Sequence, residues 1–463
     1  MRTPLPAAVH DRRQFPRRLV SLESFHRSTM TYLTPLDDPN SYRNQWNDPA
    51  VEDRIAQGIE THRKSDAVVR VTDADGNPRA GVPVRARQRD SAFHFGANIF
   101  KLAGYESQEL NQGYEEAFTG LFNAATVPFY WKTLEPEQGR LRFAADSAPI
   151  ARRPPPDLVV DFCRERGLRM LGHTLVWKEL AWQIPPWLPK DPAEITRLTE
   201  KRIREIAERY GDVIKRWDVL NEAASGPWVA THHHPMPENY EAHAFATAAR
   251  YFPDDVRFDI NDTTSYWHPH KRQYVDLIRR LRDGGAKLGG VGLQIHLFTD
   301  EDMARLALGE RFAPRQLFET LDLYGQFGLP IHVSEITLTS PDNSPEGLEL
   351  QADAARSFYR LWFSHPSVDS ITWWNVPDGG AAPGEDRVFS GLLFADMSPK
   401  PSCHALRKLL LEEWRTTAEG VTGADGCFRF RGFHGRYAVE AAGCQETLVL
   451  APRGEAAHFE IRA

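Results

Sequence analysis

The sequence predicts an α/β protein: a parallel (β/α)8 TIM barrel with a small β-sandwich module built from N- and C-terminal segments. Two observations lead to this fold class. Between residues 93 and 415, short runs rich in β-branched and aromatic residues alternate with longer helical patterns, as in βα units. Towards both ends, the residues instead follow the two-residue alternation of sheets with one buried face. The 463 residues suffice for one barrel and a further small domain.

Eight runs in the central region have the length and composition of barrel strands. They are Phe93 to Phe100, Asn123 to Trp131, Arg169 to Trp177, Ile214 to Glu222, Val256 to Asn261, Gly289 to Leu297, Pro330 to Ile336 and Ser370 to Val376. Helical patterns lie between them. In the segment Pro192 to Tyr210, apolar residues recur on one face, as expected of a helix that covers a barrel.

The two ends of the chain supply further strands. Ala67 to Thr72 and Gly81 to Arg87 read as two strands joined by a turn-rich loop, and an isolated hairpin would need more strands for stability. Residues 424–433, 435–440 and 457–461 are the candidates, and the two ends together resemble one transthyretin-like or carboxypeptidase-regulatory-like sandwich. We therefore divide the chain into an irregular N-terminal arm (1–65), N-terminal sandwich strands (66–92), the barrel (93–415) and C-terminal sandwich strands (416–463).

Composition excludes several classes of function. Lys and Arg total 56 against 63 Asp and Glu, a net charge of −7 without long like-charge runs, so we expect neither a nucleic-acid nor a membrane partner. The four Cys do not have metal-site spacing, and we expect neither a metal nor a cofactor. Cys427 and Cys444 either pair in an oxidising compartment or are two free thiols. The sequence leaves the oligomeric state open.

The localisation is also left open. Arg12-Arg13-Gln14-Phe15 looks like the start of a twin-arginine export signal, but no apolar region or small-residue cleavage site follows. A secreted or periplasmic protein would require that the start of the chain is misassigned.

Two carboxylates stand at predicted strand ends. Glu222 follows Trp217-Asp218-Val219-Leu220-Asn221 on the fourth run, and Glu335 lies within His332-Val333-Ser334-Glu335-Ile336 on the seventh. Strands four and seven face each other across the mouth of a barrel, where reacting groups are found. Hydrolysis of a glycoside with retention needs two carboxyl groups about 5 to 5.5 Å apart. The pair therefore indicates glycoside hydrolysis.

Further motifs, in their order along the chain, resemble glycoside hydrolase family 10, the xylanase family. They are Phe95-Gly96, Leu134-Glu135-Pro136-Glu137-Gln138-Gly139, Gly172-His173-Thr174-Leu175-Val176-Trp177, Asn221-Glu222, Asn261-Asp262, Gly292-Leu293-Gln294-Ile295-His296-Leu297, Trp373-Trp374 and Gly391-Leu392-Leu393-Phe394 with Pro399-Lys400-Pro401.

The resemblance implies roles for individual residues. Glu222 would be the general acid/base and Glu335 the nucleophile. Asn221 would donate to the sugar 2-hydroxyl, while Gln294 and His296 would orient the carboxylates. The other expected contacts to the substrate are His173, Trp177, Lys178, Trp374 and Tyr130.

Departures from the family pattern concentrate around the sugar subsites. Xylanases carry a polar Glu-Asn-x-x-Lys run where this chain has Thr126, Val127 and Tyr130. Lys178 replaces a His and has two interpretations, a contact to a uronic acid or a salt bridge to Glu179. The Asp that usually supports the histidine is Thr337.

The sequence thus favours a retaining endo-1,4-β-xylanase-like enzyme acting on xylan or xylo-oligosaccharides. One alternative is a β-glycosidase with altered specificity for another glycan or glycoside. The other is a catalytically inactive carbohydrate-binding protein, against which the retained carboxylates argue. The sugar, the linkage, endo or exo action and the role of the sandwich are not determined.

Overall fold

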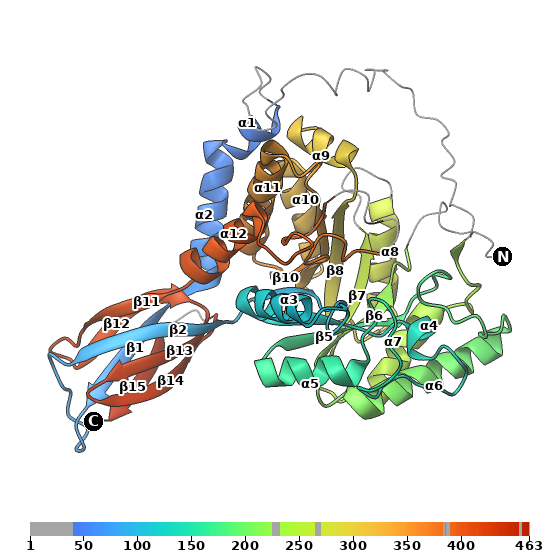
Figure 1. The fold of residues 1–463 in the computed structure, drawn as a ribbon. Coiled ribbons are helices and arrows are strands. Elements are labelled where there is room, and N and C mark those ends of the chain that lie inside the picture. Colours follow the sequence, from blue (N-terminus) through green and yellow to red (C-terminus); the bar gives the residue numbers. More distant parts are fainter. Residues whose placement is uncertain are drawn as a thin grey trace.

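The computed structural model describes residues 40–224, 232–263, 270–382, 385, 389–452 and 456–462. Its centre is a closed barrel of eight parallel strands in the order β10-β3-β4-β5-β6-β7-β8-β9 (Figure 1). The strands are β3 (His94–Asn98), β4 (Ala124–Pro128), β5 (Arg169–Val176), β6 (Arg216–Asn221), β7 (Arg257–Thr263), β8 (Gly290–Leu297), β9 (Ile331–Leu338) and β10 (Val368–Trp373). Each of the eight predicted runs overlaps one of these strands; five runs contain theirs, while β7, β9 and β10 extend two residues beyond the predicted bounds. The predicted fold class is confirmed.

Helices follow each barrel strand and cover the outside of the barrel. They are α3 (Gln108–Leu121), α4 (Trp131–Leu134), α5 (Pro156–Arg166), α6 (Pro192–Tyr210), α7 (Tyr240–Tyr251), α8 (His270–Asp283), α9 (Asp300–Ala307), α10 (Pro314–Gly325), α11 (Pro345–Ser364) and α12 (Pro401–Lys408), the last continuing as a π-helical turn (Leu409–Glu413). In the described part of the chain, none of the helices combines the length and the apolar character that crossing a membrane requires.

Helix α6 shows how the local sequence sets an element. Asp191 caps it by accepting a hydrogen bond from the Glu194 amide at 3.0 Å, and Pro192 occupies the first helical position. The apolar residues of the predicted face, such as Ile195 and Ile203, are buried. The helix therefore has the bounds that the sequence predicts.

Seven further strands form a sandwich beside the barrel (Figure 1). One sheet has the order β12-β1-β15 and the other β11-β2-β13-β14. The strands are β1 (Lys64–Thr72), β2 (Pro83–Ser91), β11 (Thr417–Val421), β12 (Cys427–Phe433), β13 (Gly435–Ala441), β14 (Cys444–Leu450) and β15 (Ala457–Arg462). Both sheets thus combine strands from the two ends of the chain. Cys427 and Cys444 are free thiols in this structure.

The implied hairpin of β1 and β2 is wrong. β1 pairs antiparallel with β12 and parallel with β15, whereas β2 pairs with β11 and β13 in the opposite sheet. The apolar faces of the two strands, represented by Val69 and Val84, meet in one core between the sheets. The loop after β1 therefore crosses between sheets. The sequence analysis also missed β11 and β14.

The prediction of an irregular arm over residues 1–65 is also wrong where the structure describes it, while residues 1–39 lie outside the described residues. Residues Tyr42–Trp46 form α1 and Pro49–Arg63 form α2. Asp48 caps α2, whose Ile55 is buried, and the helix packs against α11. Packing of one face against the barrel stabilises this helix. Its largely polar sequence gave no clear helical pattern of apolar residues.

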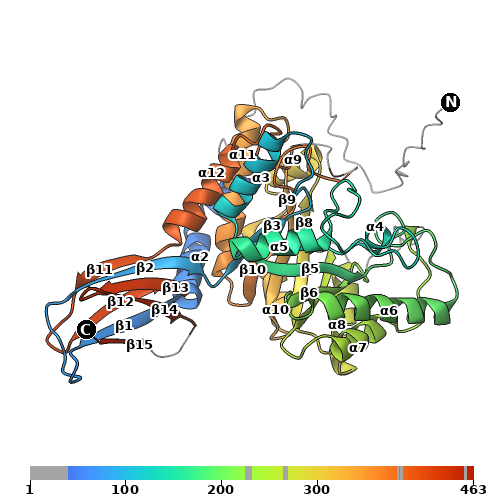
Figure 2. The same cartoon turned by 60° about the horizontal axis from the view of Figure 1, so that its bottom comes forward.

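The sandwich meets the barrel at the amino ends of the strands (Figure 2). Arg63 donates to the carbonyl oxygen of Val368, the first residue of β10, at 2.7 Å. Arg169, the first residue of β5, pairs with Asp90 of β2 at 2.8 Å. The sandwich is therefore attached at the end of the barrel opposite to the carboxyl ends of the strands.

Gly172 of β5 gives a test of how the barrel interior is packed. A Cβ atom there would lie 2.2 Å from the buried Trp217 ring, so Gly172→Ala should lower the free energy of unfolding by about 1–3 kcal/mol. The matched control is Gly120→Ala in α3, where the nearest atom would be the flexible Arg407 guanidinium at 3.5 Å. Denaturant unfolding should show the control unchanged or slightly stabilised, and equal effects of both substitutions would contradict the packing.

Candidate active site

Polar side chains gather inside the barrel towards the carboxyl ends of neighbouring strands. Barrel closure brings them together although they are far apart in sequence. The sequence-predicted members are His173 on β5, Asn221 and Glu222 at the end of β6, Gln294 and His296 on β8, and Glu335 on β9.

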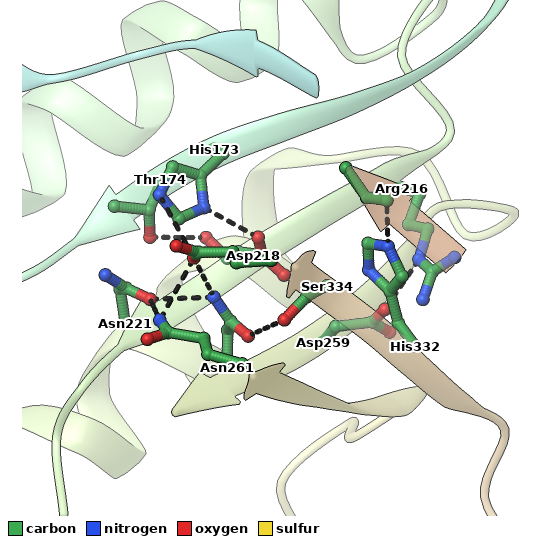
Figure 3. Close-up of polar contacts among 12 residues, drawn as sticks. His173, Thr174, Arg216, Asp218, Asn221, Asp259, Asn261, His332 and Ser334 are labelled. Carbon is green, nitrogen blue, oxygen red and sulfur yellow. Dashed lines mark hydrogen bonds and ion pairs between the residues drawn. The ribbon is translucent and has the colours of Figure 1, made fainter. Parts of the chain in front are cut away.

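Asn261 of β7, absent from the predicted set, is the junction of this site (Figure 3). Its side-chain nitrogen donates to Asn221 Oδ1 and to Glu335 Oε1, both at 2.8 Å. Its side-chain oxygen accepts from the Ser334 hydroxyl at 2.6 Å. One buried amide thus holds the ends of β6, β7 and β9 in register.

Gln294 connects the two carboxyl groups. Its side-chain nitrogen donates to Glu335 Oε1 at 3.0 Å and to Asn221 Oδ1 at 3.2 Å. The same side chain hydrogen-bonds the Glu222 carboxyl group. Glu222 and Glu335 therefore belong to one hydrogen-bonded cluster.

Glu335 is 5% exposed, and its burial raises the pKa of the carboxyl group to about 7. The charge of His173 and the hydrogen bond from Asn261 lower this pKa, so they favour the ionised form. Two amide donors on Oε1 also set the direction of the carboxylate.

Glu222 has a different environment. Burial raises its pKa well above the usual value, and the charges of Glu335 and Asp262 raise it further. Its backbone has a φ of +49°, and its amide donates to the Asn261 carbonyl at 2.8 Å. Burial and two neighbouring negative charges thus both favour the protonated form of the Glu222 carboxyl group.

Lys178 does not form the salt bridge to Glu179 that was one of its two interpretations, while the contact to a uronic acid of the substrate stays a prediction. Its ammonium group donates to the carbonyl oxygen of Ala223 at 3.1 Å rather than pairing with Glu179. The next residue, Ala224, donates its amide to Asp262 at 2.8 Å. Both bonds hold the turn that directly follows Glu222.

Asp218 orients the imidazole ring of His173. Its Nδ1 donates to the buried Asp218 carboxylate at 2.8 Å, and the Thr174 hydroxyl donates to the Asp218 carbonyl at 2.9 Å (Figure 3). The other ring nitrogen, Nε2, lies 4.0 Å from Glu335 Oε1. The imidazole thus stands beside the carboxylate.

His296 lies on the other side of Glu335, with Nε2 3.5 Å from Oε2. Its Nδ1 lies 2.9 Å from the hydroxyl of Thr337, the residue that replaces the Asp of the family pattern. Burial lowers the pKa of His296 to about 4, so the ring is neutral at pH 7. The Thr337 hydroxyl thus keeps a hydrogen-bonding contact to His296 but lacks the negative charge that an Asp would have.

Aromatic side chains form a wall next to the carboxylates. Tyr130 and Trp374 are each 4% exposed, and both lie with ring centroids 5.6 Å from the His173 ring. Phe100 packs behind them, and the half-buried Trp177 lies 6.0 Å from Tyr130. Little of the Trp374 ring is exposed to receive a sugar in this arrangement.

Sequence reasoning missed Asn261, Asp218 and Ser334 as members of the site. A signal was available, since each is a polar residue that directly follows a buried apolar residue within a strand, Trp217, Ile260 and Val333 in turn. Among the residues that the structure describes, no three His, Cys, Asp or Glu side chains are grouped to hold a metal ion.

Comparisons with known proteins relate the barrel to one family. The family model described as glycosyl hydrolase family 10 matches residues 92–408. Xylanase 10B from Thermotoga maritima superposes with a TM-score of 0.57 at 22% identity, covering 70% of this chain and 96% of that structure. This likeness concerns the fold.

Two related proteins match a longer part of this chain than the family model does. The anti-sigma-I factor RsgI6 of Acetivibrio thermocellus is 28% identical over 398 residues, which cover 85% of this chain and 46% of that protein. Endo-1,4-beta-xylanase 2 of Arabidopsis thaliana is 25% identical over 393 residues, covering 82% of this chain and 32% of that protein. The chain spans less than half the length of these two relatives.

The electrostatic coupling of the two carboxyl groups can be tested directly. Glu335→Gln removes a negative charge beside Glu222, so the pKa of Glu222 should fall. Carboxyl-carbon NMR titration measures this shift. The matched control is Glu179→Gln, since the Glu179 charge has a smaller influence on Glu222, and it should produce a smaller fall. An unchanged Glu222 titration in Glu335→Gln would contradict the coupling.

Proposed function

Because the chain belongs to glycosyl hydrolase family 10, we propose that it is a retaining glycoside hydrolase of the endo-1,4-β-xylanase type that cleaves xylan or xylo-oligosaccharides. Endo-1,4-beta-xylanase 2 of Arabidopsis thaliana and endo-1,4-beta-xylanase B of Thermotoga neapolitana, which is 26% identical over 299 residues, support a β-1,4-xylan substrate. The substrate is thus a neutral or partly acidic carbohydrate chain.

The observation that carries this proposal is the contrast between two carboxyl groups in one cluster. Gln294 hydrogen-bonds both Glu222 and Glu335. Burial and nearby negative charge raise the pKa of Glu222 well above its usual value, whereas the charge of His173 and the hydrogen bond from Asn261 favour the ionised form of Glu335. An acid and a nucleophile side by side are what retaining hydrolysis requires.

In the first step, the Glu335 carboxylate attacks the anomeric carbon and forms a covalent glycosyl ester. The bond between that carbon and the glycosidic oxygen breaks, and Glu222 gives its proton to the departing oxygen. The negative charge of Glu335 disappears in the ester. The pKa of Glu222 therefore falls at the moment when Glu222 has to act as a base.

In the second step, Glu222 takes a proton from water, and the hydroxyl oxygen attacks the same anomeric carbon from the face that the leaving group vacated. The ester bond breaks, and Glu335 regains its charge. Two displacements on one carbon retain the anomeric configuration. Both groups return to their starting protonation states.

Asn221 and His173 are the residues that we assign to sugar binding. Two hydrogen bonds engage the Asn221 side-chain oxygen, which leaves its nitrogen as the atom to donate to a sugar hydroxyl. A bond to the 2-hydroxyl that strengthens in the oxocarbenium-like transition state contributes several kcal/mol. The neutral His296 orients the second oxygen of Glu335.

A β-glycosidase of altered specificity is the second candidate. In the place of a polar subsite run, the chain has Thr126 and Val127, both buried, and Tyr130 of the aromatic wall. Fewer polar groups there weaken recognition of a neutral sugar by hydrogen bonds. Activity on aryl β-glycosides but not on xylo-oligosaccharides would favour this candidate.

The catalytic assignment is tested by Glu222→Ala and Glu335→Ala. Each should lower kcat on xylo-oligosaccharides by about 10³-fold or more. NMR of the first product formed should show the β-anomer. Unchanged rates in either variant would remove that residue from the mechanism, and an α-anomer would replace retention by inversion.

The leaving group provides a sharper test of the acid. An activated leaving group such as 2,4-dinitrophenolate departs without a proton, so kcat/KM on its glycoside should be nearly unchanged in Glu222→Ala. The kcat/KM of Glu222→Ala should fall only on glycosides with poor leaving groups, which need the proton. Glu335→Ala should fail on both kinds of glycoside.

Lys178→Met tests whether the bond to Ala223 positions the acid. Loss of this bond should lower kcat/KM about 10-fold on poor leaving groups and hardly at all on dinitrophenyl glycosides. Lys132→Met is the matched control, because its ammonium group donates to the Ala181 carbonyl on the protein surface. Equal losses of Lys178→Met on both substrates would assign Lys178 a purely structural role.

A further inference from the structure

A cavity of about 350 Å³ lies at the amino end of the barrel, opposite to the end that carries Glu222 and Glu335. Its volume is at the lower end of the range of small-molecule sites. The first residues of several barrel strands line it. The ionisable side chains in its wall are His94 of β3, Arg169 of β5, Lys215 and Arg216 at the start of β6, Arg257 of β7 and His332 of β9.

The wall of this cavity is basic on all its sides. Four of its side chains carry a positive charge and two are imidazoles, whereas none of the described Asp or Glu residues lines the cavity. The segments that lead into all eight barrel strands lie within the described ranges of the chain, so this comparison includes every strand.

The nearest carboxylates lie behind the guanidinium groups. Arg216 and Arg257 both donate to Asp259, at 2.6 and 2.7 Å, and both also contact Asp369. Asp259 is fully buried, and neither Asp belongs to the wall of the cavity. These ion pairs therefore present their positive side to the cavity.

The two other cations are arranged in the same way. Arg169 pairs with Asp90 of the sandwich at 2.8 Å, and Lys215 pairs with Asp255 at 3.0 Å. In both pairs the cation lines the cavity and the carboxylate does not. The positive potential thus comes from the orientation of the ion pairs and does not require an excess of charge.

The two imidazoles respond to this potential. The pKa of His94 is lowered to about 3, mainly by burial and then by the charges of three arginines of the wall, which Asp369 opposes. Burial and the charge of Arg216 also lower the pKa of His332 well below its ordinary value. The wall thus opposes a further positive charge and favours a negative one.

The wall also contains nitrogen atoms whose hydrogen-bonding capacity is not used. Arg216 Nη2, Arg257 Nη2 and His332 Nδ1 are buried without a hydrogen-bond partner in the described part of the chain. His332 uses only its other nitrogen, which lies 2.6 Å from the Thr372 hydroxyl. Arg216 and His332, which lie close together in Figure 3, are 8% and 2% exposed. Such buried polar groups normally have partners, and oxygen atoms of a ligand would supply them.

We propose that this cavity binds a phosphate group, either as inorganic phosphate or as the phosphate ester of a small molecule. Guanidinium groups bind phosphate oxygens through short, charge-assisted hydrogen bonds. The basic groups come from β3, β5, β6, β7 and β9, so they approach the cavity from several directions. A tetrahedral anion matches this arrangement better than a planar carboxylate does. The site is separate from the proposed glycosidase function and does not depend on it.

Calorimetry on the whole chain tests the site with inorganic phosphate and with glucose 1-phosphate, and glucose is the neutral control. At least one phosphate compound should bind with one-to-one stoichiometry and a Kd below about 1 mM, whereas glucose should bind at least about 10-fold more weakly. The phosphate compound that binds more tightly identifies the free or the esterified form as the ligand.

Arg169→Gln should weaken phosphate binding at least about 10-fold, because the wall loses one cation. Asp90 keeps a partner in this variant, since Arg436 also pairs with it at 3.3 Å. The matched control is Arg166→Gln, whose side chain is 47% exposed on α5 and does not line the cavity. It should leave the affinity unchanged, and Arg169→Lys, which keeps the charge, should retain part of it.

Histidine NMR locates the bound anion without any substitution. Addition of the phosphate compound that binds should shift the ring signals of His94 and His332 and leave that of His296 in the active site unchanged. Absence of binding by both phosphate compounds would overturn the proposal, as would equal affinities for glucose and glucose 1-phosphate. Shifts confined to His296, or an unchanged affinity in a folded Arg169→Gln variant, would also overturn it.

Discussion

The chemistry of this protein depends on the position of one buried amide, that of Asn261. Its nitrogen holds the Asn221 and Glu335 side chains, its oxygen accepts from Ser334, and its backbone carbonyl accepts the Glu222 amide. These four contacts join β6, β7 and β9. Since a buried polar group must be satisfied, the network admits few alternative arrangements. The network thus fixes the Glu335 carboxyl group and the backbone of Glu222 relative to one residue.

The two glutamates show how surroundings separate identical side chains. Burial raises the pKa of both, but amide donors and His173 favour the charge on Glu335, while Asp262 and Glu335 itself oppose it on Glu222. The residues that differ from the family pattern lie around the two glutamates. Burial keeps His296 neutral beside the Thr337 hydroxyl, and Lys178 bonds to the backbone after Glu222 rather than to a carboxylate.

The sandwich and the candidate active site lie at opposite ends of the barrel. Strands from the N- and C-terminal segments share both sheets of the sandwich, so the barrel is an insertion within it. Arg63 and the Arg169–Asp90 pair attach the sandwich at the amino ends of the barrel strands. The opposite end carries the carboxylates and the aromatic wall. The sandwich is therefore attached at the end of the barrel that is remote from Glu222 and Glu335.

The sequence by itself determined the barrel and its eight strands, because hydrophobic periodicity is a local property, and the order of motifs placed Glu222 and Glu335 at strand ends. It also predicted α6 from its apolar face. Only the tertiary structure decided that β1 and β2 lie in opposite sheets, that residues 49–63 form a helix, and that Asn261 joins three strands. The same holds for the bond of Lys178 to the Ala223 carbonyl oxygen. Their partners lie in other elements, and a local pattern does not encode which distant groups the closed barrel brings within hydrogen-bonding distance.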